Sequence, residues 1–235
     1  MNIDYLKNLY KKLNIKKYIN FRISLAFFTL SALGLWADSP PSAFKLEIDK
    51  DNIKVFTRVH EGATLKEFKG VVTIRTSLSA LVALMDDTNS YTNWMHDCVK
   101  SALVEHPNPS ERTTYIVNDA PWPVSQRDMF IYSRTTQNKE TKMVTIALEG
   151  RATFRPEIKG YVRVTTLKGS WRFTPLKKGL IEVTYQVYSD PGGSLPQILA
   201  NSTVVDIPYH TLKNMRTFVQ QERYQKAKYK EIMEP

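Results

Sequence analysis

The sequence predicts an α+β domain in which a curved, mostly antiparallel sheet is covered by one long C-terminal helix. Three observations support this fold class: two strand-like segments precede two short helical segments, six further strand-like segments follow one another directly, and the chain ends in a long helical pattern. Consecutive strands joined by short turns favour antiparallel pairing, and the apolar face of such a sheet has to be covered by another element.

The strands are predicted from alternating apolar residues. Residues 52–60 and 67–76 have this pattern, and Gly70 in the second indicates a bulge or a close approach of another segment. Turn-forming stretches such as HPNPS and PLKKG separate the later strands. These are predicted near Val99–Glu105, Thr113–Asp119, Arg127–Thr136, Val144–Glu149, Gly160–Thr174 and Ile181–Asp190. We expect the strand from Gly160 to Thr174 to be kinked at Gly169.

Two helices are predicted between the second and third strands. Ser77 is placed to cap a helix over residues 77–87, in which Leu78, Leu81 and Met85 follow helical spacing. A shorter helical segment follows over residues 88–97.

The C-terminal helix begins with a capping pair, Ser194 and Gln197, around Pro196 in its first turn. Pro208 interrupts the pattern, so we predict a break or kink near Ile207. Beyond it, one apolar stripe is formed by Leu212, Met215 and Val219.

The positive charge is concentrated at the N-terminus. The chain of 235 residues has a formal net charge of +10, but residues 1–22 hold six basic residues and one acidic residue, and residues 23–37 hold none. The remainder, with 27 basic and 22 acidic residues, has a net charge of +5. Since its aromatic residues are not interleaved with basic ones on an evident surface, nucleic-acid binding is not expected.

Residues 1–37 are predicted to be a targeting segment. A basic stretch followed by the 15-residue apolar run ISLAFFTLSALGLWA is typical of a secretory signal peptide, and an uncleaved membrane anchor is the alternative. The run is shorter than the roughly 20 residues that a spanning helix needs. We therefore predict an exported protein, periplasmic or extracellular, with a linker over residues 38–44 and one domain over residues 45–232.

The sequence lacks the spacings of cysteine, histidine and serine residues that are typical of metal sites and of nucleophilic catalysis. Cys98 is the only cysteine, which excludes an intrachain disulfide. The four histidines lie in four separate predicted elements without metal-ligand spacing, and GGSLP at Gly192 is a helix start rather than a nucleophile elbow. No metal, cofactor or catalytic residue is predicted.

A stiff corner precedes the strand that starts at Arg127. In APWPVSQRD, from Ala120 to Asp128, two prolines around Trp122 favour a rigid extended connection. Arg127 and Asp128 are consecutive on a strand and so point to opposite faces. We predict that each is a framework ion-pair partner that holds a different neighbour.

Several short motifs occur in the order found in one family. They are DNIKVFTR, FKG, NWM, APWPVSQRD, P-x₃-GYVRV, GSWRFTP, DPGGSLP and LAN. Together they span about residues 45–225, and the chain resembles a START domain, the steroidogenic-acute-regulatory-protein-related lipid-transfer family, in its bacterial exported form. The resemblance implies the helix-grip (START/Bet v 1-like) fold, with a lipid-sized cavity between the curved sheet and the C-terminal helix.

Non-enzymatic lipid binding or transfer in the bacterial envelope is the function that this resemblance implies, with a phospholipid or another lipid as partner. The alternative is an enzyme of the same superfamily, a cyclase or a hydrolase that uses the same cavity. The predicted cavity residues are Trp94, Tyr115, Phe130, Arg163, Trp171, Tyr185, Leu199 and Met215, with Arg163 as a headgroup anchor. Each apolar member is equally consistent with ordinary core packing, and Arg163 with a solvent-facing position.

The basic segment RYQKAKYK, Arg223 to Lys230, suggests transient contact with anionic membrane lipids. A solvated helix end whose cations complement the helix dipole explains the same residues. The protein is expected to act as a monomer.

Overall fold

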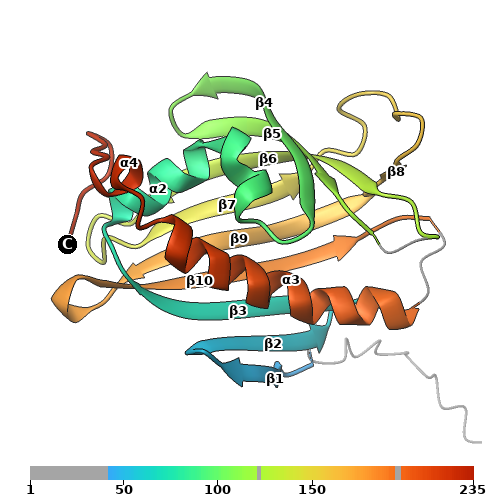
Figure 1. Cartoon of the computed structure of the whole chain (residues 1–235), viewed down its shortest axis with the longest axis horizontal. Helices are drawn as coiled ribbons and strands as arrows, with labels where there is room; N and C mark the ends of the chain where they lie inside the picture. Colours follow the sequence, from blue (N-terminus) through green and yellow to red (C-terminus); the bar gives the residue numbers. More distant parts are fainter. Residues whose placement is uncertain (1–41, 121–122, 194–196) are drawn as a thin grey trace, which may run out of the picture. The chain divides into compact units, whose positions relative to one another are not determined.

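The computed structural model describes residues 42–120, 123–193 and 197–235, with side chains except those of residues 197–203. The predicted targeting segment 1–37, most of the predicted linker, and Trp122, Ser194 and Pro196 lie outside these residues. The described part contains one large sheet with α3 (Gln197–Phe218) lying across it (Figure 1).

The sheet is antiparallel along its main path, in the order β1-β2-β3-β10-β9-β7-β6-β5-β4, while β8 pairs with β6 in parallel. This arrangement confirms the predicted α+β fold class. The strands are β1 (Lys45–Lys50), β2 (Ile53–Val59), β3 (Lys66–Arg75), β4 (Cys98–Asn108), β5 (Glu111–Asn118), β6 (Arg127–Gln137), β7 (Val144–Gly150), β8 (Val162–Arg163), β9 (Thr166–Pro175) and β10 (Leu180–Asp190).

The shorter helices are α2 (Leu78–Asp86), α4 (Glu222–Gln225) and the 3₁₀ segments η1 (Thr88–Asn93) and η2 (Lys177–Gly179). Ser77 caps α2 as predicted, since its hydroxyl accepts from the backbone N–H of Ala80. The basic segment from Arg223 to Lys230 is not a helix end: α3 stops at Phe218, and α4 covers only the first residues of the segment.

The predicted strand from Gly160 to Thr174 is two strands. β8 turns aside to pair with β6, while β9 continues between β7 and β10. The split occurs where Arg163 turns to Asp128 on β6. The predicted kink at Gly169 is also wrong, because the pairing of β9 with β10 is regular there. A side chain at Gly169 would collide with the backbone and side chain of β10, so this glycine permits close strand packing.

Strand β1 was not anticipated by the alternation pattern. Its sequence KLEIDK has only two apolar residues, and it pairs with β2 at the edge of the sheet. An edge strand buries little on either face, so its residues need little apolar character.

The predicted break near Ile207 is absent, since α3 continues through Pro208. A proline removes one N–H group, and the packing of a 22-residue helix on the sheet compensates for that loss. Gly70 on β3 is the contact point: a Cβ there would lie 3.1 Å from Pro208 Cβ and 2.7 Å from Leu212 Cδ1. The close approach that Gly70 predicted is therefore made by the helix.

Candidate functional site

A cavity lies between the inner face of the sheet and α3. The empty space between its lining residues, together with the opening to solvent, is about 840 Å³. Side chains from β3, β5, β6, β7, β9 and β10 form its wall, and α2, η1, the loop over residues 94–97 and α3 complete it.

Strand alternation decides which residues face this cavity. On β5 the lining residues are Thr114, Ile116 and Asn118, and on β6 they are Met129, Ile131 and Ser133. Successive side chains on a strand point to opposite faces, so the residues between these lie on the outer face of the sheet.

An aromatic wall forms the middle of the cavity. Trp171 on β9 and Tyr185 on β10 are register partners, and their rings stack with centroids 3.7 Å apart and planes 4° apart. The Phe68 ring meets Tyr185 edge-on at 4.9 Å. Trp171 and Tyr185, both predicted cavity residues, therefore share one rigid apolar surface.

The polar part of the lining is uncharged apart from one imidazole. No Asp, Glu, Lys or Arg is among the lining residues that the structure describes. The lining residues with hydroxyl, amide or imidazole groups are Tyr91, His96, Thr114, Asn118, Ser133, Tyr185, Ser189 and Thr211.

Both lining tyrosines stay protonated at neutral pH. Burial raises the pKa of Tyr91 to about 12, and its hydroxyl donates to the Met85 carbonyl at 2.6 Å. Burial likewise raises the pKa of Tyr185 above its ordinary value. A general acid or base works best with a pKa near the operating pH, so neither tyrosine is tuned for that work.

Trp94 and Met215 lie in the core next to the cavity rather than in its lining. Both are fully buried, and the Trp94 ring meets Trp171 edge-on at 6.2 Å. Trp94 therefore packs against the aromatic wall, and Met215 is part of the core. Leu199 lies in the part of α3 whose side chains are not described.

Tyr115 and Phe130 face away from the cavity, so their predicted place in it is wrong. With Val117 they form a separate cluster on the outer face of the sheet, against which Phe154 and Tyr161 pack. On its own strand, each lies between two residues that line the cavity, so its side chain points to the opposite face.

Arg163 is likewise not a headgroup anchor. Its Nε and Nη2 donate to the two carboxylate oxygens of Asp128, both at 2.9 Å, and the two side chains are 3% and 1% exposed. The remaining donors reach the carbonyls of Ala152, Arg155 and Pro156. All five N–H groups are used, so this pair fastens the loop over residues 151–161 to β6.

Asp128 is thus a framework ion-pair partner, whereas Arg127 is not seen in one. Arg127 donates to the Ser125 carbonyl, and its Nε has no partner among the described residues. Burial lowers the pKa of Arg127. The pairing partner of Asp128, Arg163, was missed as such because 35 residues separate the two in sequence.

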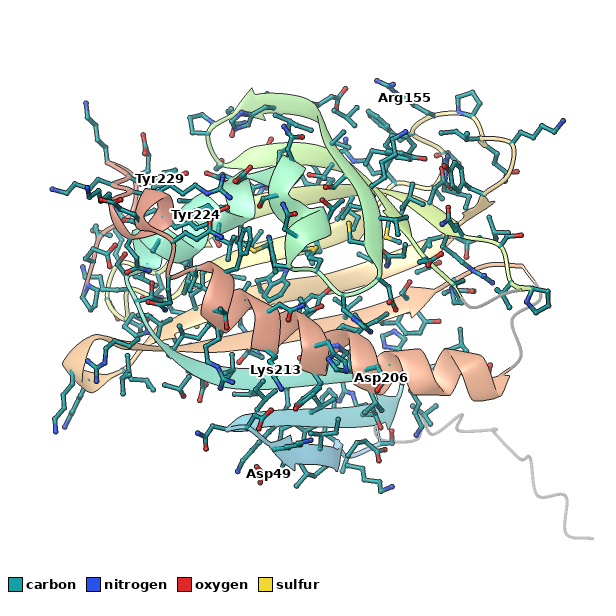
Figure 2. All side chains as sticks on the ribbon, viewed as in Figure 1. Asp49, Arg155, Asp206, Lys213, Tyr224 and Tyr229 are labelled. Atoms are coloured by element: carbon teal, nitrogen blue, oxygen red, sulfur yellow. The ribbon has the colours of Figure 1, made fainter. Side chains whose placement is uncertain are left out.

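The β1–β2 turn forms hydrogen bonds and an ion pair with α3. The Asp51 carboxylate accepts from Tyr209 Oη at 2.7 Å and from Lys213 Nζ at 2.9 Å, while Arg216 donates to the Asp51 carbonyl at 2.6 Å. Figure 2 marks Lys213 on α3. Hydrogen bonds from Lys213 and Tyr209 lower the pKa of Asp51 to about 2. The φ of Asp51 is 55°, a left-handed value typical of a tight turn. The sequence did not indicate that this turn would contact α3.

The loop over residues 94–97 fastens α3 on another side. The backbone N–H of His96 donates to Thr211 Oγ1 at 3.1 Å, and the side-chain amide of Asn214 donates to the Trp94 carbonyl at 3.1 Å. The rings of His96 and His210 stack with centroids 4.6 Å apart. The cover of the cavity is therefore attached by polar contacts that water can replace.

The C-terminal tail folds back onto α2. Tyr224 and Tyr229, which lie near each other in Figure 2, donate to the carboxylates of Asp87 and Asp86. The Glu234 carboxylate accepts from the backbone N–H groups of Leu78 and Ser79 at 3.0 and 2.8 Å. A carboxylate at a helix N-terminus satisfies free donors and complements the dipole, so the tail stabilises α2.

Two further properties concern the described residues. They contain no group of three or more His, Cys, Asp or Glu side chains that could hold a metal ion. None of the helices in this part of the chain combines the length and apolar character needed to cross a membrane.

A curved antiparallel sheet that holds a C-terminal helix over an apolar cavity defines a helix-grip ligand-binding domain. Within that class the chain belongs to the START family: the sequence model of the START domain matches residues 32–225. Members of this family bind hydrophobic ligands, which agrees with the apolar lining.

Two bacterial proteins are similar to this chain over most of its length. A Pseudomonas aeruginosa protein described as uncharacterized is 35% identical over 195 residues, which are 83% of this chain and 96% of that protein. The crystal structure of a STAR-related lipid transfer protein from Xanthomonas axonopodis (fragment 25–204) is 36% identical, with a TM-score of 0.71 over 77% of this chain and all of that one. Human STARD10, 16% identical with a TM-score of 0.67 over 77% of this chain and 74% of that one, shares the fold.

Proposed function

We propose that this protein binds one lipid in the cavity under α3 and carries or presents it in the bacterial cell envelope. The observation that carries the proposal is the uncharged, largely apolar lining around the Trp171–Tyr185 wall. Such a surface removes apolar ligand area from water, and each buried CH₂ group contributes about 0.8 kcal/mol.

Binding without catalysis fits this lining better than the alternative, a cyclase or hydrolase. An active site of that kind needs convergent titratable groups with pKa values near neutrality. The lining offers two tyrosines with raised pKa values and His96, whose ring is stacked on His210. We therefore propose a carrier that acts as a monomer and makes transient contact with a membrane surface.

Native mass spectrometry of the purified protein, followed by organic extraction, tests the proposal. We expect one lipid per chain in the parent protein. Leu148→Trp places a larger side chain in the cavity and should lower the bound fraction by about an order of magnitude, since overpacking costs about 1–3 kcal/mol.

The matched control is Leu176→Trp, because Leu176 is 42% exposed and distant in register from the lining. It should retain lipid like the parent. Equal lipid content in the Leu148→Trp protein, or no extractable lipid and no binding of added lipid by the parent, would refute a carrier function for this cavity.

A further inference from the structure

The cavity that we propose as the lipid site contains no group to balance a full charge. The lining residues in the described ranges include no Asp, Glu, Lys or Arg. Within the described residues, the lining itself is therefore free of carboxylate, ammonium and guanidinium groups.

Two buried arginines on the strands around the cavity, Arg112 and Arg163, each bind a carboxylate. Arg112 lies two residues before the lining residue Thr114 on β5. Its Nη1 donates to Asp86 at the end of α2, while its buried Nη2 has no partner among the described residues and is not part of the lining. Arg163 and Asp128 bind each other on the outer face. The His96 imidazole in the lining is already engaged: its Nε2 lies 3.5 Å from Asp97 Oδ1, and its ring stacks on His210.

An ionised headgroup would be costly in this surrounding. Transfer of a carboxylate or phosphate from water to an apolar site without a counter-charge costs several kcal/mol or more. A hydroxyl, ester or ketone oxygen needs only one hydrogen bond to offset its desolvation.

Tyr185 can supply that hydrogen bond. Its side chain lines the cavity on the Trp171 wall, and its hydroxyl takes part in none of the hydrogen bonds among the described residues. Buried tyrosine hydroxyls usually have a partner, and a hydroxyl both donates and accepts. The free hydroxyl therefore suits an alcohol or a carbonyl oxygen.

From the charge-free lining and the free hydroxyl we infer that the cavity selects electrically neutral lipids, whose alcohol, ester or ketone oxygen hydrogen-bonds Tyr185. The inference rests on the proposed lipid-binding function and specifies its ligand class. Free fatty acids and lipids with a phosphate inside the cavity are excluded by the same argument.

Displacement of the uncharged dye Nile red by ligands with one common oleoyl or oleyl chain tests the inference. The ligands are oleyl alcohol, monooleoylglycerol, oleic acid and oleoyl lysophosphatidic acid, each used below its aggregation concentration at about pH 8, where carboxylates are ionised. We expect the two neutral lipids to displace the dye at concentrations at least about 10-fold lower than the two anions.

Tyr185→Phe tests the anchor. Loss of one hydrogen bond should weaken oleyl alcohol binding by about 2- to 12-fold. The matched control is Tyr188→Phe on the same strand, because Tyr188 lies on the opposite face and stacks on His60. Its affinity for oleyl alcohol should equal that of the parent.

Oleic acid that binds as tightly as oleyl alcohol would overturn neutral selectivity and leave the lipid-carrier function standing. Unchanged binding by a folded Tyr185→Phe protein would overturn the anchor. If the variant does not fold, the ligand series on the parent still decides selectivity. Failure of all four lipids and Nile red to bind the parent would instead contradict the proposed function.

Discussion

Asp128 and Arg163 form a buried ion pair at the start of β6. A carboxylate with two N–H donors and a guanidinium with five acceptor contacts form a pair that is satisfied on every side. The Asp128 hydrogen bonds raise the pKa of Arg163, so the guanidinium stays charged. Phe130 adds its ring face, 5.0 Å from the guanidinium carbon. The pair therefore stabilises the framework and does not contact the cavity.

Removal of one partner should be strongly destabilising. We expect Asp128→Ala to lower the free energy of unfolding by about 3–5 kcal/mol, because it leaves the Arg163 charge buried without compensation. The Arg134–Glu111 pair is the control: Arg134 is 58% exposed, so Arg134→Ala should change stability by at most about 1 kcal/mol. Urea unfolding followed by circular dichroism measures both. An Asp128→Ala protein whose free energy of unfolding equals that of the Arg134→Ala protein would contradict a framework role for Asp128.

At the scale of elements, α3 is the cover that has to move if a ligand is to enter. Its apolar side packs on the core through Tyr209, Leu212 and Met215, and polar contacts attach it to the β1–β2 turn and to the loop over residues 94–97. Polar contacts exchange with water at little net cost, so we expect the apolar packing of Leu212 and Met215 to be the main resistance to opening of α3.

A disulfide between α3 and the sheet should block ligand exchange. Gly70→Cys and Pro208→Cys, in a Cys98→Ser background, suit this test, since a Cβ at Gly70 lies 3.1 Å from Pro208 Cβ and a disulfide prefers about 3.8 Å. We expect lipid transfer between vesicles to be lost on oxidation and restored on reduction, with stability equal or higher when oxidised. Equal transfer in both states, with the cross-link verified, would show that ligand enters elsewhere.

The sequence predicted the elements better than the faces they present. Alternation on β5 shows that Tyr115 and Ile116 point in opposite directions, but not which of them α3 covers. The outer face at this point is covered by the loop over residues 151–161, whose position depends on the distant Asp128–Arg163 pair, so Tyr115 and Phe130 were assigned to the wrong side. Trp171 and Tyr185 were placed in the cavity, where the structure finds them.

Contacts between segments that are distant in sequence were not predicted, for a related reason. Pro208 predicted a break because local rules omit the packing of α3 on Gly70. Asp51 and Glu234 are unremarkable acidic residues until the turn meets α3 and the tail meets α2. Local patterns contain no information on these pairings.

At the scale of the whole molecule, we propose separate roles for residues 1–37 and for the domain. The basic and apolar character of that segment supports export, which we propose takes the protein to the envelope. N-terminal sequencing of protein from the envelope fraction should find a start close to Leu35 or Asp38 if the segment is cleaved. An uncleaved chain in the membrane fraction would favour an anchor, and a full-length chain in the soluble cytoplasm would contradict export.

Photo-cross-linking with a neutral lipid analogue is the most direct test that a ligand occupies the cavity. A monoacylglycerol with a diazirine in its acyl chain would be irradiated with the protein and the labelled peptides mapped by mass spectrometry. We expect labels on lining residues of β5, β6, β9 and β10, among them Ile116, Met129, Leu167 and Trp171. Labels concentrated on the outer-face residues Tyr115, Phe130 and Phe154, or spread without preference over exposed residues, would contradict a ligand site under α3.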